Sequence, residues 1–104
     1  MKTFKDKVAV ITGAGSGMGR YLAVLLAKDG ADIVACDVNK ETLDETVEML
    51  RKHNVSVSSH LLDVADKEAI EALPQKVIDQ HGKVDLVFNN AGVTTGKHFK
   101  DMEE

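Results

Sequence analysis

The sequence predicts an α/β fold built on a parallel β-sheet. Apolar runs of strand-forming residues alternate along the chain with segments of helical periodicity. Candidate strands lie at residues 8–11, 33–36, 55–62 and 84–88. Because short runs that are apolar throughout are typical of strands buried on both faces, they favour a parallel sheet. A helix between consecutive strands then requires right-handed crossovers.

Each intervening segment has an apolar face at helical spacing. The three faces consist of Leu22, Leu25 and Leu26, then Leu43, Val47 and Leu50, and then Ile70, Leu73 and Val77. Asn39 and Asp66 precede the second and third helices and are suitable N-caps. The predicted order of elements is therefore β-α-β-α-β-α-β.

Pro74 conflicts locally with this pattern because it falls inside the third helical segment. A proline costs ~3 kcal/mol in a continuous helix interior. Two alternatives remain open: the helix kinks, or it breaks and restarts with Pro74 in its first turn.

Composition limits the classes of function. The chain has 104 residues, which suits one domain over residues 1–104, and its formal net charge of -4 gives no indication of a nucleic-acid partner. Its longest apolar run is far shorter than the ~20 residues of a membrane span, and no signal peptide is visible, so we expect no membrane partner. Cys36 is the only cysteine, so no internal disulfide can form, and a cytoplasmic location is expected. The four histidines show no metal-ligand spacing, and we expect no metal site.

Four glycines occupy every second position directly after the first strand: Gly13, Gly15, Gly17 and Gly19. A glycine-rich turn between a strand and a helix lets a ligand approach the backbone, and the helix N-terminus favours a pyrophosphate. The nucleotide-hydrolase loop does not fit, because Arg20 and Tyr21 follow the last glycine. The pattern G-x-G-x-x-G does not fit either, because its third glycine would fall on Met18 or Arg20. The pattern that does fit is T-G-x-x-x-G-x-G, starting at Thr12.

The octapeptide TGAGSGMG resembles the coenzyme loop of the short-chain dehydrogenase/reductase family. The resemblance implies that Gly13, Ser16, Gly17, Met18 and Gly19 contact the coenzyme. Gly15 falls at a variable position and is expected to be incidental. The alternative is a glycine-rich turn with a purely structural role.

Asp37 ends the second strand, 18 residues after Gly19. A carboxylate at this point of a dinucleotide fold can accept both ribose hydroxyls of an adenosine. The same charge would repel a 2′-phosphate, and neither Ser16 nor Val38 offers a compensating positive charge. Asp37 therefore favours NAD over NADP, unless it is only a strand-end turn residue.

Two further segments follow strands and extend the resemblance. Asp63 and Val64, in LLDV, resemble the family's contact to the adenine ring, with helix capping as the alternative for Asp63. The tetrapeptide NNAG follows the fourth strand, and the resemblance implies that Asn90, Ala91 and Gly92 line the nicotinamide side. The carboxyl ends of parallel strands are where open α/β sheets bind ligands.

The resemblance covers the chain from about Lys7 to its last residue, and it implies the amino-terminal half of a Rossmann-type three-layer fold. Four parallel strands in the order 3-2-1-4 and three crossover helices form this partial NAD(P)-binding domain. The implied function is hydride transfer between nicotinamide and an alcohol or carbonyl substrate in a full-length form. The alternative function is a non-catalytic NAD-binding module.

The family's catalytic Ser and Tyr-x-x-x-Lys pair are not found, because the only tyrosine is Tyr21 and Leu25 lies four residues later. We expect no catalytic residue here and an inactive chain on its own. The resemblance also implies an exposed apolar edge at the fourth strand and one sheet face without helices. Self-association, or a marginally stable fold, is the expected consequence.

Overall fold

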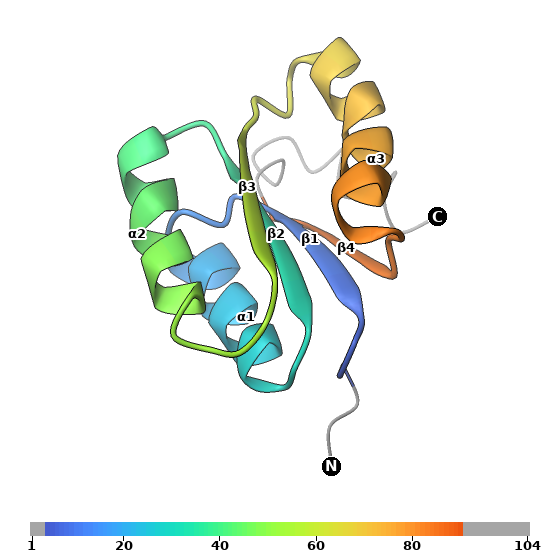
Figure 1. Ribbon diagram of the computed structural model, residues 1–104. Helices are drawn as coiled ribbons and strands as arrows, with labels where there is room; N and C mark the ends of the chain where they lie inside the picture. Colours follow the sequence, from blue (N-terminus) through green and yellow to red (C-terminus); the bar gives the residue numbers. More distant parts are fainter. Residues whose placement is uncertain (1–3, 91–104) are drawn as a thin grey trace.

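The computed structural model describes residues 4–90. Figure 1 shows a sheet with helices on both sides. In chain order the elements are β1 (Val8–Thr12), α1 (Gly17–Lys28), β2 (Asp32–Asp37), α2 (Lys40–Leu50), β3 (Val57–Leu61), α3 (Lys67–His81) and β4 (Leu86–Asn89). The strands pair in parallel in the order β3-β2-β1-β4, so both the α/β fold and the strand order are confirmed.

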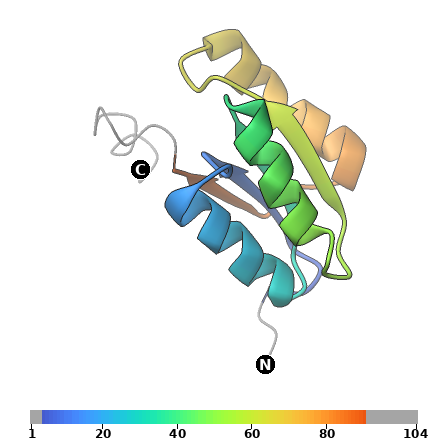
Figure 2. The ribbon, with the colours of Figure 1, turned by 90° about the vertical axis from the view of Figure 1, so that its left-hand side faces the viewer.

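Two hydrophobic clusters form on opposite faces of the sheet because strand side chains alternate between faces. Ala9 and Ile11 of β1 pack with the helices α1 and α2. Val8 and Val10 instead pack with Leu73 and Val77 of α3. Figure 2 shows α1 and α2 side by side on one face, with α3 on the other. The three layers are therefore those that the family resemblance implies.

The second and third helices begin at the predicted caps. The Asn39 side chain accepts a hydrogen bond from the Thr42 N–H, and the Asp66 side chain accepts one from the Ala69 N–H. At the other end of α3, Gly82 has φ 88°, a left-handed conformation that favours glycine and ends the helix.

Helix α3 continues through Pro74, so the alternative in which it breaks and restarts is wrong. Proline has no N–H, and the Ile70 carbonyl therefore loses its usual partner four residues later. Leu73 and Val77, on either side of the proline, are buried against the sheet. Their burial offsets the lost hydrogen bond and keeps the helix in one piece.

The expectation of a sheet face without helices is wrong, because α3 lies on that face. The α3 contacts reach β1 and β2 through Val10, Val34 and Cys36. Beyond α3, Val87 of β4 keeps 52% of its surface exposed. Exposed apolar surface therefore remains on the part of this face that lies around β4.

Candidate functional site

The candidate site lies at the carboxyl edge of the sheet, where all four parallel strands end. Thr12, Asp37 and Asn89 are the last residues of β1, β2 and β4, and Asp63 follows β3 closely. The parallel register places these ends on the same side of the sheet. The predicted residues within positions 4–90 are therefore brought to one edge, whereas Ala91 and Gly92 lie outside the described residues.

The glycine loop between β1 and α1 uses three of its glycines for distinct reasons. Gly13 and Gly17 have φ 68° and 57°, a region that other residues adopt at a cost. A Cβ on Gly19 would overlap the Gly13 carbonyl oxygen and lie 3.0 Å from the Asn90 side-chain nitrogen. A Cβ on Gly17 would meet none of the described atoms within 4 Å. The open side of Gly17 is compatible with the close approach of a ligand to the loop.

The N-terminus of α1 differs from those of the other two helices in residues 4–90. Ser16 is its N-cap, yet the Ser16 side chain makes no capping hydrogen bond, and the first turn of α1 has no acidic residue. The first-turn N–H groups therefore lack the side-chain acceptor that Asn39 and Asp66 supply elsewhere. This end of the helix has a partial positive charge, which suits phosphate oxygens. Met18, in the same turn, is 70% exposed.

Asp37 is held firmly beside the glycine loop. Its Oδ2 atom accepts the Gly15 N–H at 2.8 Å, and its Oδ1 atom accepts the N–H groups of Val38 at 2.7 Å and Asn39 at 3.1 Å. A carboxylate offers about four lone-pair positions, so about one, on Oδ2, stays open in this arrangement. A second ribose hydroxyl would have to displace a backbone N–H, most simply that of Gly15.

Gly15 packs closely against the side chains of Asp37 and Thr42. A Cβ at this position would lie 2.6 Å from Thr42 Oγ1 and 2.8 Å from Asp37 Oδ2. Both distances are shorter than ordinary contacts, so a side chain would displace the carboxylate or the hydroxyl. Both atoms are the ends of side chains that can rotate, so the expectation that Gly15 lies at a variable position of the motif stays a prediction.

Asp63 and Val64 lie in the turn between β3 and α3. The Asp63 Oδ1 atom accepts the Ala65 N–H at 2.9 Å, while Asp66 caps the helix. Asp63 therefore shapes the turn that precedes the cap and does not cap α3 itself. Its side chain is exposed and Val64 is half-buried, which leaves the carboxylate accessible to a ligand.

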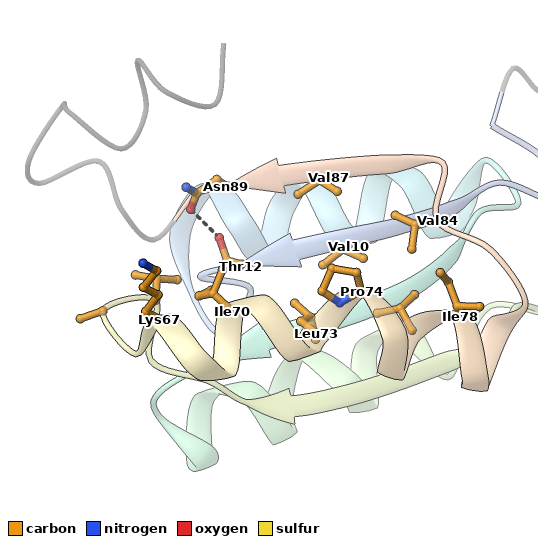
Figure 3. Close-up of a pocket in the computed structure, with 13 residues that line it drawn as sticks. Val10, Thr12, Lys67, Ile70, Leu73, Pro74, Ile78, Val84, Val87 and Asn89 are labelled. Atoms are coloured by element: carbon orange, nitrogen blue, oxygen red, sulfur yellow. Dashed lines mark hydrogen bonds between the residues drawn. The ribbon is translucent and has the colours of Figure 1, made fainter. Parts of the chain in front are cut away.

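Thr12 joins the ends of β1 and β4. Its hydroxyl donates to the Asn89 side-chain oxygen at 2.9 Å and accepts the Asn90 N–H at 3.1 Å. The dashed line in Figure 3 marks the first of these hydrogen bonds. Thr12 entered the sequence pattern only as a spacing residue. Its structural role is to fix the backbone at Asn90, whose side-chain nitrogen lies against Gly19.

A groove of about 780 Å³ runs between α3 and the strands β1 and β4. Figure 3 shows Ile70, Leu73 and Pro74 of α3 facing Val10 and Val87 across it. Thr12 and Asn89 lie at one end, but neither the glycine loop nor Asp37 lines the groove. Val64 lines the groove as well, so this apolar surface adjoins the candidate site and shares residues with it.

Residues 4–90 offer neither a candidate metal site nor a helix that could span a membrane. These residues contain no group of three or more His, Cys, Asp or Glu side chains that could hold a metal ion. Their helices are all too short or too polar to cross a bilayer.

Known proteins resemble this chain in sequence and in fold. An uncharacterised oxidoreductase, YxbG, of Bacillus subtilis is 40% identical over 93 residues, which cover 89% of this chain and 34% of that protein. The crystal structure of an NAD+-bound xylitol dehydrogenase has a TM-score of 0.84 and 37% identity, covering 88% of this chain and 35% of that one. Carveol dehydrogenase from Mycobacterium avium in complex with NAD has a TM-score of 0.83 and 33% identity, covering 88% and 38% respectively.

The chain thus spans about a third of the length of these three proteins. The family model described as short chain dehydrogenase matches residues 7–104, which is nearly the whole chain. With the glycine loop, the strand order and the polar residues at the strand ends, this match shows that the chain belongs to the short-chain dehydrogenase family.

Proposed function

We propose that the chain is the coenzyme-binding portion of an NAD-dependent oxidoreductase. The observation that carries this proposal is the position of Asp37, whose carboxylate lies at the end of β2 and bonds to the Gly15 N–H of the glycine loop at 2.8 Å. A ribose hydroxyl of the coenzyme would thus donate to the Asp37 carboxylate, and the neighbouring phosphate would lie at the N-terminus of α1. NAD-bound relatives with the same fold support the choice of ligand.

The described residues fit a dinucleotide in extended form. The N–H groups at the start of α1, around Gly17, Met18 and Gly19, would receive the pyrophosphate. The open lone pair of Asp37 would receive a ribose hydroxyl, and the exposed Asp63 carboxylate, with Val64 beside it, would contact the adenine.

The other end of the dinucleotide would lie beyond the end of β4. Asn90, together with Ala91 and Gly92 outside the described residues, would line the nicotinamide side. The role of the chain is to bind and orient the coenzyme, which when bound accepts or delivers a hydride.

The preference for NAD over NADP follows from charge. A 2′-phosphate would lie against the Asp37 carboxylate, and two negative groups in contact repel each other. Ser16 and Val38, the neutral neighbours in the loop and after β2, cannot compensate for this repulsion. Exposed residues at both positions leave room for the unphosphorylated ribose.

The reaction class proposed for the full-length form is hydride transfer between the nicotinamide and an alcohol or carbonyl compound. We place no catalytic residue in this chain. Tyr21 is 62% exposed on α1, and Leu25 stands four residues later where a Tyr-x-x-x-Lys pair requires lysine.

The position of Asp37 beside the glycine loop also favours a second candidate, a module that binds NAD without turnover. Reading the coding frame past Glu104 discriminates between the two. A downstream Ser and Tyr-x-x-x-Lys supports the oxidoreductase, and an immediate stop supports the binding module. Dehydrogenase turnover by the pure 104-residue chain would contradict the absence of catalytic groups in both cases. A cytoplasmic location stays a prediction from the sequence.

Coenzyme titration tests the role of Asp37. We expect the chain to bind NADH about tenfold or more tightly than NADPH, because a charge-assisted hydrogen bond contributes roughly 1.5–3 kcal/mol. Asp37→Ala should reduce the difference between the two coenzymes to about threefold or less. Fluorescence energy transfer to the bound nicotinamide, or calorimetry, gives both dissociation constants.

The matched control is Asp44→Ala, which removes an exposed carboxylate on α2 that pairs with Lys40. This variant should keep the wild-type preference. Equal affinity of the wild-type chain for NADH and NADPH would refute the role given to Asp37.

A further inference from the structure

The peptide group that joins Ala14 to Gly15 is hydrogen-bonded at both ends. Its carbonyl oxygen, on Ala14, accepts the Thr46 hydroxyl at 2.8 Å. Its N–H, on Gly15, donates to Asp37 Oδ2 at 2.8 Å. Because the two atoms belong to one planar unit, a rotation that breaks one hydrogen bond also disturbs the other.

Thr46 is fully buried on α2, which packs beside α1 (Figure 2). Its hydroxyl has one proton to donate. The Thr46 oxygen accepts the Arg20 Nε–H at 2.9 Å. The hydroxyl proton of Thr46 must therefore point away from Arg20, toward a carbonyl acceptor. The Ala14 carbonyl is the nearer acceptor at 2.8 Å, compared with 3.3 Å for the Thr42 carbonyl.

Arg20 is fixed at its other end as well. One terminal nitrogen donates to the Thr42 carbonyl at 3.0 Å and to the Glu45 carboxylate at 3.0 Å. The guanidinium is thereby held against α2, which leaves Nε aimed at Thr46.

These contacts form one continuous chain of donors and acceptors. It runs from the Arg20 guanidinium through the Thr46 hydroxyl and the 14–15 peptide to the Asp37 carboxylate. Every dipole points from the cation toward the anion, and hydrogen bonds in such a chain polarise and strengthen one another. The chain links α1, α2 and the glycine loop to the end of β2.

We propose that Thr46 is a positioning residue for coenzyme selection, which holds the Asp37 carboxylate in place through the Ala14–Gly15 peptide, with Arg20 orienting its hydroxyl. The proposal rests on the proposed function, because Asp37 is the residue on which the preference for NAD depends. Thr46 contacts no coenzyme itself. Its contribution is to keep the Gly15 N–H on Asp37 Oδ2, so that the remaining lone pair faces the ribose.

Thr46→Val and Thr46→Ser form a matched pair of variants. Valine keeps the branched shape and removes the hydroxyl, so the Ala14 carbonyl loses its buried partner and the chain loses its middle member. Serine keeps the hydroxyl and should restore the wild-type behaviour.

The first readout is the NMR chemical shift of the Gly15 amide proton in the coenzyme-free chain. An N–H bonded to a carboxylate resonates downfield, and Thr46→Val should move this signal upfield, whereas Thr46→Ser should leave it near its wild-type position. A role for Thr46 in packing alone predicts the reverse order, because valine keeps the branched shape and serine loses a buried methyl group.

The second readout is the ratio of NADH to NADPH affinity, measured by titration. Thr46→Val should lower NADH affinity about tenfold, which corresponds to ~1.4 kcal/mol, with a smaller change for NADPH. Arg20→Met tests the same chain at a partly exposed site and should shift both readouts in the same direction. Glu45→Gln removes only the outer ion pair of Arg20. It should leave the Gly15 amide shift and the affinity ratio near their wild-type values.

An unchanged Gly15 amide shift in both Thr46→Val and Arg20→Met would overturn the proposal, whatever the coenzyme data show. If the wild-type chain does discriminate between NADH and NADPH, an unchanged affinity ratio in both variants would overturn it as well. Failure of the proposed function has a different signature, in which the wild-type chain itself fails to discriminate between NADH and NADPH while the Gly15 shift still responds to Thr46→Val.

Discussion

At the scale of single residues, the environment of Cys36 shows how burial changes chemistry beside the candidate site. Cys36, the last residue of β2 before Asp37, is 1% exposed and belongs to the hydrophobic core. Burial, with the adjacent Asp37 charge as a smaller cause, raises the pKa of the Cys36 thiol to about 12. The thiolate is therefore scarce at neutral pH, and the side chain is not a nucleophile there.

We predict that this raised pKa makes folding stability depend on pH. Below the unfolded pKa of 9.0 both states hold the proton and the full stability is present. As the pH rises from 9 toward 12, the unfolded state ionises first, so the free energy of unfolding falls by up to ~1.4 kcal/mol per pH unit. Urea unfolding of the wild type and Cys36→Ala between pH 8 and about pH 10.5 measures the difference, which should change only above the unfolded pKa. Rapid alkylation of the folded chain by iodoacetamide at neutral pH would contradict the burial.

Thr46 shows which site residues the sequence could and could not reveal. Leu43, Thr46, Val47 and Leu50 are all buried on α2, and Thr46 supplies the missing i+3 position of the apolar pattern. A hydroxyl on a buried helix face requires a partner, and this was the available signal. The identity of the partner could not be predicted, because Ala14 lies 32 residues away and the contact depends on how α2 packs against the loop.

At the scale of elements, Asp85 connects the beginning of β1 to the approach to β4. Its carboxylate accepts the Val8 N–H at 2.9 Å and pairs with Lys83 at 3.1 Å. These contacts, the Val8 N–H first, lower the pKa of Asp85 below its usual value of 3.8. The carboxylate thus stabilises the pairing of two strands that are far apart in sequence.

We predict that Asp85→Asn weakens the acid dependence of folding. A lowered pKa gives a stabilising contribution that is present above pH 3.8 and is lost as the pH falls through the lower value. Asparagine can still accept the Val8 N–H but does not titrate, so its unfolding curve should be flatter in this range, with lower stability at neutral pH. Circular dichroism between about pH 2 and pH 6 checks this. Lys83→Gln keeps the Val8 hydrogen bond to a titrating carboxylate, so it should flatten the pH dependence less than Asp85→Asn does. A larger flattening would contradict the role of the Val8 N–H.

Most elements were predictable because their signals are local. The caps at Asn39 and Asp66 and the apolar faces of the helices define the order of elements, while the strand ends shift by one or two residues. The strand order came from the resemblance and not from periodicity. The continuity of α3 through Pro74 was not predictable, because it depends on the burial of Leu73 and Val77 against strands distant in sequence.

At the scale of the whole molecule, the apolar groove and β4 form an exposed hydrophobic region. Val87 is 52% exposed and Ile78 is 44% exposed, and both line the groove. Strand β4 pairs only with β1 within residues 4–90, so its other edge has unpaired backbone groups there. Apolar surface beside an open strand edge promotes association.

We predict that the 104-residue chain self-associates through this region. Val87→Lys should shift sedimentation toward the monomer, because it places a charge on the edge strand. Leu61→Lys is the control, since Leu61 is similarly exposed at 58% but lies on β3, at the opposite edge of the sheet. Sedimentation velocity at several concentrations measures both. An equal loss of association in the two variants would count against the groove as the interface.

The pairing of β1 with β4 also has a consequence for folding kinetics. Thr12 is opposite Asn89, a separation of 77 residues, although β1 is made first during synthesis. Long-range parallel pairing of this kind slows folding, because loop closure precedes the gain from contacts. The apolar segment VAVIT of β1 therefore lacks its β4 partner until almost ninety residues have emerged from the ribosome. We expect this interval to be when the nascent chain has the greatest need of a chaperone.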